Sequence, residues 1–455
     1  MLPSFRARCG SAKIIPPLTY HTGMEGRLVS ATVAIAVSLG AAALGQLTER
    51  PLAEALTHPA IEYASRPTTD PIVELNRRID EGAVRIAFDE GTGYLRSVLE
   101  ALNVPIESQM LVMSKTGVQG LHTGPENPRA IFFNDAVTVG YIRGAPLVEL
   151  AVHDPRQGVI LYTIDQKPQA RVRFDRPSSC LRCHVAYNTL HVPGMLLRSV
   201  FIAPDGLPLS QFGSYDADDR TPFSKRWGGW YVTGTHGSMR HLGNAIVARG
   251  ETPETIVSDR TLNRTSIGTF DAHGYVSALS DIAALMVFEH QSHMTNLITR
   301  IGWEARIAAY EHRLDLGSSP LQDGVRELVD YLLFVDAQPL TAALEGTSGF
   351  AQTFATQGPF DGRGRSLRQL DLQHRLLRYP CSYMIYSAAF RALPIEVRQA
   401  VYRRMWEILS GSDSAPRYGR LAQSDRRAIV EIVRQTMTDW PSEFAPPSRA
   451  KPPMP

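Results

Sequence analysis

Four short runs of apolar residues decide the fold class of this chain. They are Ala130–Asp135 (AIFFND), Val137–Ile142 (VTVGYI), Leu147–Asp154 (LVELAVHD) and Gly158–Asp165 (GVILYTID). Each run is rich in β-branched and aromatic residues, and turn-forming residues separate one run from the next. This pattern predicts an antiparallel sheet of about four or five strands over residues 111–174. A further hairpin is expected over residues 197–214, with Pro204-Asp205-Gly206 as its turn.

The pattern changes after Ser277, where apolar residues recur at helical spacing. Helices are expected over residues 277–313, 322–337, 365–392, 394–411 and 425–438, and one or two more over 71–103. The predicted fold class is therefore α+β, in which an antiparallel, strand-rich segment precedes a mainly helical C-terminal region.

The N-terminal residues have the layout of an export signal. The stretch Leu28–Leu44 carries no charge, Arg27 precedes it, and small residues lead to Gln46. Its 17 residues are also at the short limit for a membrane-spanning helix. We therefore expect residues 1–45 to be a signal peptide or an N-terminal membrane anchor, and the protein to be periplasmic. The later segments are a linker with N-terminal helices (46–110), a strand-rich domain (111–276), a helical domain (277–440) and a disordered tail (441–455).

Composition sets limits on the class of protein. Apolar residues make up 44% of the 455 residues and charged residues 20%, which is too polar for a polytopic membrane protein. The 47 basic and 45 acidic residues give a formal net charge of +2, so no basic excess favours nucleic acid as a partner. Four cysteines in a chain of this length exclude a disulfide scaffold.

The motif that carries chemistry is Cys180-Leu181-Arg182-Cys183-His184, the C-x-x-C-H attachment pattern of c-type haem. The two thiols add to the two vinyl groups of the porphyrin. The histidine after the second cysteine then lies beneath the iron as the proximal ligand. One motif predicts one covalent haem c, held by Cys180, Cys183 and His184.

Three other interpretations of the cysteine pair stay open. A thioredoxin-type redox pair needs a βαβ setting, whereas this pair follows the polar, proline-containing turn FDRPSS. A zinc site needs two further ligands, for which Cys381 and His191 lack a signature spacing. The third interpretation is a chance match.

The sixth iron ligand decides the chemistry, because methionine favours electron transfer and an open position permits ligand binding or peroxide chemistry. We rank His290 and His236 first as distal candidates and Met195, eleven residues after His184, third. His290 and His293 share one face of a predicted helix at i, i+3 spacing. A lone helical histidine is nevertheless more often structural.

The stretch Phe223–Gly237 (FSKRWGGWYVTGTHG) places two tryptophans and a tyrosine beside four glycines. We expect it to cover the haem through Trp227 and Trp230, with Arg226 or Lys225 pairing a propionate. The alternative is a glycine-rich turn capped by core aromatic residues.

Together, C-L-R-C-H followed by V-P-G, R-W-G-G-W-Y-V-T-G-T-H-G and F-E-H-Q resemble a family of exported, single-haem c-type proteins of bacteria. The resemblance covers most of residues 125–440. It implies haem c and an exported location, and it implies no particular reaction.

The expected function is that of an exported, single-haem c-type cytochrome in electron transfer, whose redox partner the sequence does not identify. The alternative is a haem-based ligand sensor or a peroxidase-like oxidoreductase with an open or labile sixth position. About 410 mature residues exceed the ~100 that suffice to bury one haem, which favours an added function. Asp135, His153 and Glu289 can assist peroxide cleavage, although a structural role explains each more simply. Whether the protein is an enzyme stays open.

Overall fold

The computed structural model describes residues 52–252, 263–268, 270–317, 320–442 and 444. The predicted signal segment (1–45) and almost all of the predicted tail (441–455) lie outside these residues. Strands gather between Met110 and Thr235, and helices dominate from Ile282 onward, which confirms the predicted α+β class. Residues 51–455 form one compact unit. The boundary expected near residue 277 therefore marks a change of secondary structure within that unit.

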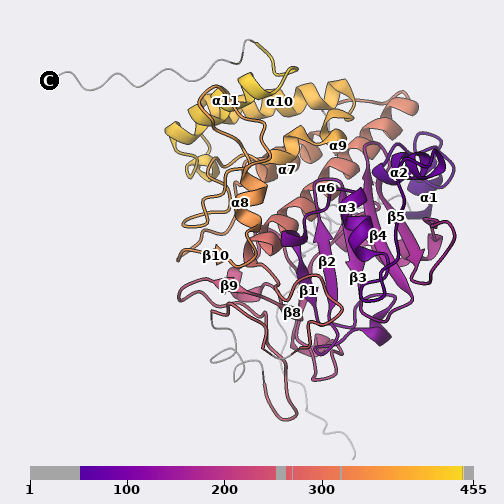
Figure 1. Ribbon diagram of the computed structural model, residues 1–455. Helices are drawn as coiled ribbons and strands as arrows, with labels where there is room; N and C mark the ends of the chain where they lie inside the picture. Colours follow the sequence, from indigo (N-terminus) through magenta and orange to yellow (C-terminus); the bar gives the residue numbers. More distant parts are fainter. Residues whose placement is uncertain (1–51, 253–262, 269, 318–319, 443, 445–455) are drawn as a thin grey trace, which may run out of the picture. The chain divides into compact units, whose positions relative to one another are not determined.

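A six-stranded antiparallel sheet forms the centre of the strand-rich segment (Figure 1). In spatial order its strands are β5 (Gly158–Asp165), β4 (Leu147–Asp154), β3 (Val137–Tyr141), β2 (Arg129–Phe133), β1 (Met110–Val112) and β8 (Trp230–Tyr231). The long hairpin β4–β5 pairs over its whole length, from Leu147 opposite Asp165 to Asp154 opposite Gly158. The expected hairpin over 197–214 is also present, as β6 (Arg198–Val200) paired with β7 (Ser214–Asp216).

The two faces of the sheet pack against different helices, because successive side chains of a strand point to opposite sides. One face carries Phe132, Val139 and Leu150, which share a core with the N-terminal helices. These helices are α1 (Leu52–Thr57), α2 (Pro71–Asp80) and α3 (Leu95–Ala101). The opposite face carries Val112 and Phe133, which belong to the core around α6 (Ile282–Tyr310).

Helix α6 connects the sheet to the C-terminal helices, since it contacts β5 as well as α7, α8 and α9. It begins at Asp281, whose side chain accepts hydrogen bonds from the amides of Ala283 and Ala284. The other carboxylate oxygen of Asp281 accepts from the amides of Thr347 and Ser348. The start of α6 is thereby fixed to the loop after the short strand β10 (Glu345–Gly346), which pairs with β9 (Gly234–Thr235).

The C-terminal helices are α7 (Leu321–Leu332), α8 (Phe350–Ala355), α9 (Ala388–Arg391), α10 (Ile395–Ser410) and α11 (Gln423–Thr436). The helix expected over 365–392 is wrong for most of its length. That segment is irregular, and a left-handed Leu372 (φ 57°) and Pro380 interrupt it. Proline removes a backbone donor and disfavours helix at the preceding residue.

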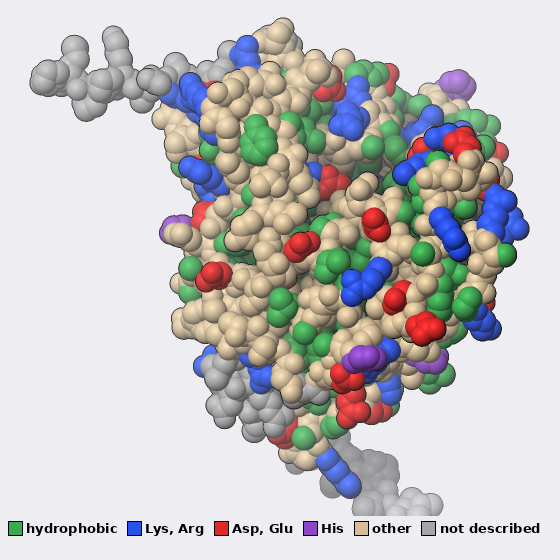
Figure 2. Space-filling view, in the orientation of Figure 1, with side chains coloured by type: hydrophobic (Ala, Val, Ile, Leu, Met, Phe, Trp, Pro, Cys, Tyr) green, Lys and Arg blue, Asp and Glu red, His purple; other side chains and the backbone are tan. Residues whose placement is uncertain are grey.

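The surface in the described part of the chain is mixed in charge. On the face shown in Figure 2, basic and acidic side chains are interspersed. None of the helices within the described residues combines the length and the hydrophobicity that crossing a bilayer requires.

Candidate functional site

The C-x-x-C-H motif forms one helical turn beside the edge strand of the sheet. Asp175 pairs with Thr163 of β5 through two backbone hydrogen bonds of 2.8 and 3.0 Å, so the chain enters the motif from the β5 edge. After Pro177 a 3-10 turn (Ser178–Cys180) leads into α4 (Leu181–His184). Residues three apart on a helical turn lie on the same side. This spacing places the thiols of Cys180 and Cys183, neither of which forms a disulfide, on the same side of the turn.

The ring of His184 is held in an orientation suited to metal binding. Its Nδ1 lies 2.9 Å from the carbonyl oxygen of Gly194, and the amide of Gly194 donates in return to the carbonyl of His184 at 2.9 Å. Nδ1 therefore carries the proton, which leaves the lone pair on Nε2. Among the described residues no hydrogen bond reaches Nε2. Burial lowers the pKa of His184, so the imidazole is neutral, as a metal ligand must be.

The segment after the motif is fixed to α6 by one amide side chain. Asn296 accepts a hydrogen bond from the amide of Met195 at 3.1 Å and donates to its carbonyl at 2.7 Å. Gly194 is in such close contact with Asn296 that a Cβ at this position would overlap the side-chain amide. Helix α6 therefore sets the position of the carbonyl that orients His184.

A cavity of about 370 Å³ lies between this motif and the α6 face of the sheet. Cys180, Cys183 and His184 line it on one side, and Trp230 of β8 and Phe288 of α6 line it elsewhere. The sheet side of the cavity includes the small residues Thr138, Gly140, Ala151 and Thr163 beside larger apolar ones such as Ile131, Leu150 and Leu161. Its volume lies within the usual range of ligand pockets, roughly 300–1,000 Å³.

Two charged side chains of the sheet also line the cavity. Arg129 of β2 and Glu149 of β4 stand on opposite sides of β3, and Nε of the arginine lies 3.6 Å from Oε2 of the glutamate. That distance exceeds a hydrogen bond. Nε and Nη2 of Arg129 are buried and have no hydrogen-bond partner. A sequence signal for Arg129 exists, because it is the one charged residue of the otherwise apolar strand β2.

The side chains that line the cavity are of the kinds that a covalently attached haem would need. They include two thiols, an imidazole with an available Nε2, the aromatic rings of Trp230 and Phe288, and a cation with unused donors. The thioredoxin interpretation finds no βαβ unit around the motif, since the strands of the six-stranded sheet are antiparallel. The zinc interpretation finds no group of three or more ligating side chains within the described residues.

Met195 lines the same cavity, but it is poorly placed to be the sixth ligand. Gly194 lies on the Nδ1 side of the His184 ring, whereas a metal binds on the Nε2 side. Met195 directly follows Gly194, so its backbone lies on the Nδ1 side of the His184 ring and not on the Nε2 side, where His184 would bind a metal.

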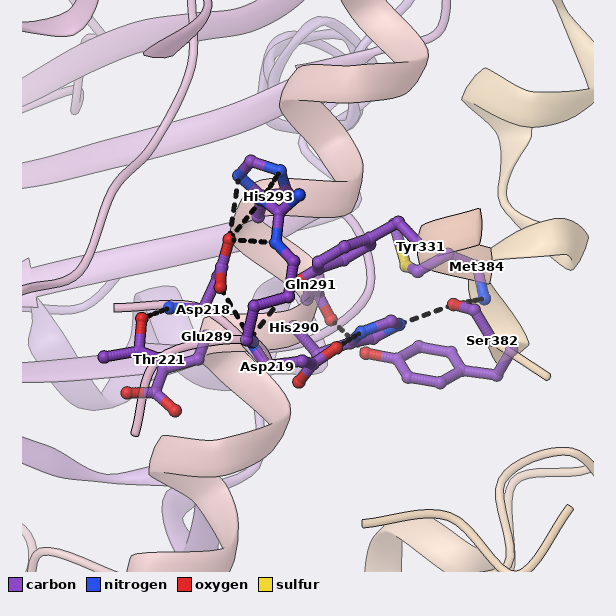
Figure 3. A network of polar contacts seen from close by, with 12 residues as sticks. Asp218, Asp219, Thr221, Glu289, His290, Gln291, His293, Tyr331, Ser382 and Met384 are labelled. Carbon is purple, nitrogen blue, oxygen red and sulfur yellow. Dashed lines mark hydrogen bonds and ion pairs between the residues drawn. The ribbon is translucent and has the colours of Figure 1, made fainter. Parts of the chain in front are cut away.

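His290 lies outside the cavity, and both of its ring nitrogens have partners (Figure 3). Nδ1 is 2.6 Å from Oδ2 of Asp219, and Nε2 is 2.6 Å from Oγ of Ser382. The ring also stacks on Phe334, with centroids 4.6 Å apart. A buried histidine bonded through both nitrogens has no lone pair to offer to a metal. His290 is therefore not placed to be the distal ligand.

Arg226 and Trp227 are also buried away from the cavity, whereas Trp230 lines it. Arg226 donates from Nη1 to Glu289 at 2.9 Å and from Nη2 to the carbonyl of Asp219 at 3.0 Å. These bonds use the guanidinium inside the protein, so Arg226 is not placed to pair a propionate. Lys225 likewise does not line the cavity, and its ammonium lies over the ring of Tyr215.

His236, the other leading distal candidate, belongs to a second buried cluster. Its Nδ1 lies 2.8 Å from the carbonyl oxygen of Met239, and its ring is 4.6 Å from that of His241. Phe223 and Trp227 pack around this pair. None of these residues lines the cavity, which makes the cluster part of the core.

The His241 ring makes stability depend on pH. Burial and the facing His236 lower the pKa of His241 to about 3, whereas an unfolded histidine titrates near 6.5. Stability from this group is present above pH 6.5 and is lost as the pH falls, because only the unfolded state gains the proton. Between pH 6.5 and 5 the loss is about 2 kcal/mol.

His241→Asn should therefore reduce the loss of unfolding free energy between pH 7 and pH 5 by about 2 kcal/mol. Asparagine keeps an acceptor for the amide of Gly243, which now donates to Nδ1 at 3.0 Å. Urea unfolding at the two pH values measures the difference. His374→Asn is the control, since that side chain is 82% exposed. Equal acid sensitivity in wild type and His241→Asn would contradict the assignment.

The three residues considered for peroxide cleavage lie apart from the cavity. Asp135 pairs with Arg368, and Glu289 pairs with Arg226. His153 lies on β4 near the turn to β5, where burial lowers its pKa to about 4. Each has a structural role, and none is brought to the thiols of Cys180 and Cys183.

No protein-family model matches the chain, and no curated protein and no solved structure is significantly similar to it.

Proposed function

We propose that the protein is an exported c-type haem protein with one haem attached to Cys180 and Cys183 and with His184 as the proximal ligand. One observation carries this proposal: the Nδ1 of His184 is bonded to Gly194 at 2.9 Å, and its Nε2 is left for iron in a cavity that both thiols line. The resemblance carried by the sequence motifs points to the same cofactor.

The few metal-binding side chains in the cavity favour a haem iron that binds a small molecule from outside the protein. Within the described residues that line the cavity, the histidine, methionine and cysteine side chains are His184, Met195 and the two attachment cysteines. The backbone of Met195 lies on the Nδ1 side of the His184 ring and not on the Nε2 side. A haem iron with an open position binds small molecules or activates peroxide. We therefore place ligand sensing or peroxidase-like oxidation ahead of electron transfer.

The protein residues supply the setting for such a ligand. Thr138 and Thr163 bring hydroxyl groups to the sheet side of the cavity, and Glu149 brings a carboxylate. Trp230 and Phe288 restrict water on other sides of it. A few polar groups in an apolar pocket are the usual arrangement for orienting a small ligand.

Electron transfer remains the second candidate, on a specific observation. Cys183 is exposed, so the attachment edge of the cofactor would lie at the surface of the protein. An accessible edge suits electron exchange with a partner protein. A sixth ligand from outside the described residues, or a shift of Met195, would be required.

Haem staining after denaturing electrophoresis tests covalent attachment. The wild-type protein, produced with export and haem maturation, should stain, and the Cys180→Ala/Cys183→Ala variant should lose the stain. Cys381→Ala is the matched control, because Cys381 is fully buried away from the cavity and should not affect the stain. A stained double variant would refute attachment through this motif.

Carbon monoxide separates the two functions. With an open position, the visible bands of the ferrous protein should shift when carbon monoxide is added. Bands that stay unmoved would mean two firm protein ligands and would make electron transfer the working function.

A further inference from the structure

We propose that Arg129 binds a carboxylate of the cofactor, namely a haem propionate. This inference rests on the proposed covalent haem. It replaces the earlier expectation that Arg226 or Lys225 has this role.

The guanidinium of Arg129 is largely buried and incompletely hydrogen-bonded. The Arg129 side chain is 15% exposed and lines the cavity, and two of its nitrogens, Nε and Nη2, are buried with no hydrogen-bond partner. A buried cation without hydrogen bonds is costly, and buried charges are generally paired. Glu149, at 3.6 Å from Nε, compensates the charge only in part. Nε and Nη2 of the guanidinium thus lack a hydrogen-bonding acceptor.

A glycine makes room for the Arg129 side chain. The guanidinium lies against the backbone of Gly117, and any Cβ there would overlap it. Gly140 separates Arg129 from Glu149 on the sheet, since it belongs to β3 between the two strands. Glycine at position 117 therefore makes the room that the guanidinium occupies.

Arg129 and the C-x-x-C-H motif lie at different strands of the sheet. The chain enters the motif from β5, and Arg129 lies on β2, three strands away in the sheet. Arg129 lines the same cavity as the two thiols, and its charge acts on His184. The propionates stand at the edge of the porphyrin opposite the vinyl groups that cysteines capture. An arginine on the sheet wall of this cavity is therefore a candidate partner for one of them.

An arginine side chain is well suited to bind a propionate. An arginine presents a planar fork that matches a carboxylate, and charge-assisted bonds of this kind are the strong ones. Arg198 is the other cation on the cavity wall, but its side chain is 43% exposed and it faces Asp216 at 3.6 Å. Arg129 is therefore the better candidate for a desolvated carboxylate.

The wild-type haem protein provides the first test. The propionate paired with Arg129 stays ionised, so at most one of the two haem propionates should titrate between pH 5 and pH 8 in the pH dependence of the reduction potential. The resonance Raman bending band of one propionate should be unchanged over this range. Titration of both propionates within this range in the wild type would overturn the proposal, whether or not any variant folds.

The second test replaces the arginine. In Arg129→Met, and in Arg129→Gln if the first variant does not fold, the propionate band should shift. The pKa seen in the pH dependence of the potential should rise by about 1–3 units. Arg129→Lys, which keeps the charge, should reverse most of the rise. Arg300→Met is the control, because Arg300 is 22% exposed, pairs with Glu327 and does not line the cavity.

The outcomes separate this inference from the function on which it rests. A wild-type protein without covalent haem would overturn both. A haem-bearing Arg129→Met variant whose Raman band and pH profile match the wild type would overturn only the role of Arg129.

Discussion

Replacing Arg226 with methionine should lower the free energy of unfolding by about 3–5 kcal/mol, because it leaves the buried carboxyl group of Glu289 and two backbone carbonyls without their hydrogen-bond donor. Arg226 and Glu289 are both almost fully buried, with side chains 3% and 0% exposed. The guanidinium also donates from Nε to the carbonyl of Thr221 at 2.9 Å. The bond to Glu289 joins the loop before β8 to α6, and the other two bonds hold the loop itself.

The same variant should become more sensitive to alkaline pH. Burial raises the pKa of Glu289, and the guanidinium of Arg226 opposes that rise. Without Arg226 the pKa rises further, so the folded state holds a proton that the unfolded state releases at a lower pH. A raised carboxyl pKa means that stability is lost as the pH increases. Burial has already raised the pKa of Glu289 to about 8 in the wild type, so the extra loss in Arg226→Met should grow as the pH rises above about 8.

Urea unfolding followed by far-UV circular dichroism measures both effects. Arg77→Met is the control, because Arg77 pairs with Glu74 and Glu81 on the exposed side of α2 and should change stability little. The double variant Arg226→Met/Glu289→Met should recover part of the loss, since it removes the unpaired acid as well. A double variant less stable than Arg226→Met would show that the pair is not the cause.

The sheet could be predicted from the sequence, because β-strand periodicity and turn residues are local signals. The runs at 130–165 became β2 to β5 with the expected antiparallel pairing. By contrast β8, with only Trp230 and Tyr231, is too short to show any period. Its pairing with β1 follows from tertiary packing. The error at 365–392 has a similar origin, since buried leucines can be spaced as in a helix within an irregular segment.

The candidate site could be predicted only where one motif contains the chemistry. C-x-x-C-H has local spacing, so the sequence identified both thiols and His184. The partners of His290, by contrast, are Asp219 and Ser382, which lie 71 and 92 residues away from it in the sequence. No local pattern indicates such contacts. The same holds for Asn296, whose two bonds to Met195 join residues 101 positions apart.

Gly194→Ala should displace the ring of His184 and destabilise the protein by about 3 kcal/mol. The new methyl group overlaps the side-chain amide of Asn296, and overpacking of this kind costs about 1–3 kcal/mol. Moving the segment of Gly194 away from α6 also breaks the hydrogen bonds between Met195 and Asn296, and each buried group left unsatisfied costs about 1–3 kcal/mol. The carbonyl of Gly194 then no longer orients Nδ1 of His184, so the ferric absorption spectrum should change along with the melting temperature.

The cause can be isolated with Asn296→Ala. This substitution removes the obstructing amide and also its two bonds to Met195. If overlap is the cause, Gly194→Ala/Asn296→Ala should be about as stable as Asn296→Ala alone, so that the two losses do not add. Gly268→Ala is the matched control, because a Cβ at that glycine meets nothing within 4 Å. Additive losses, or an unchanged spectrum in Gly194→Ala, would mean that α6 does not set the orientation of His184.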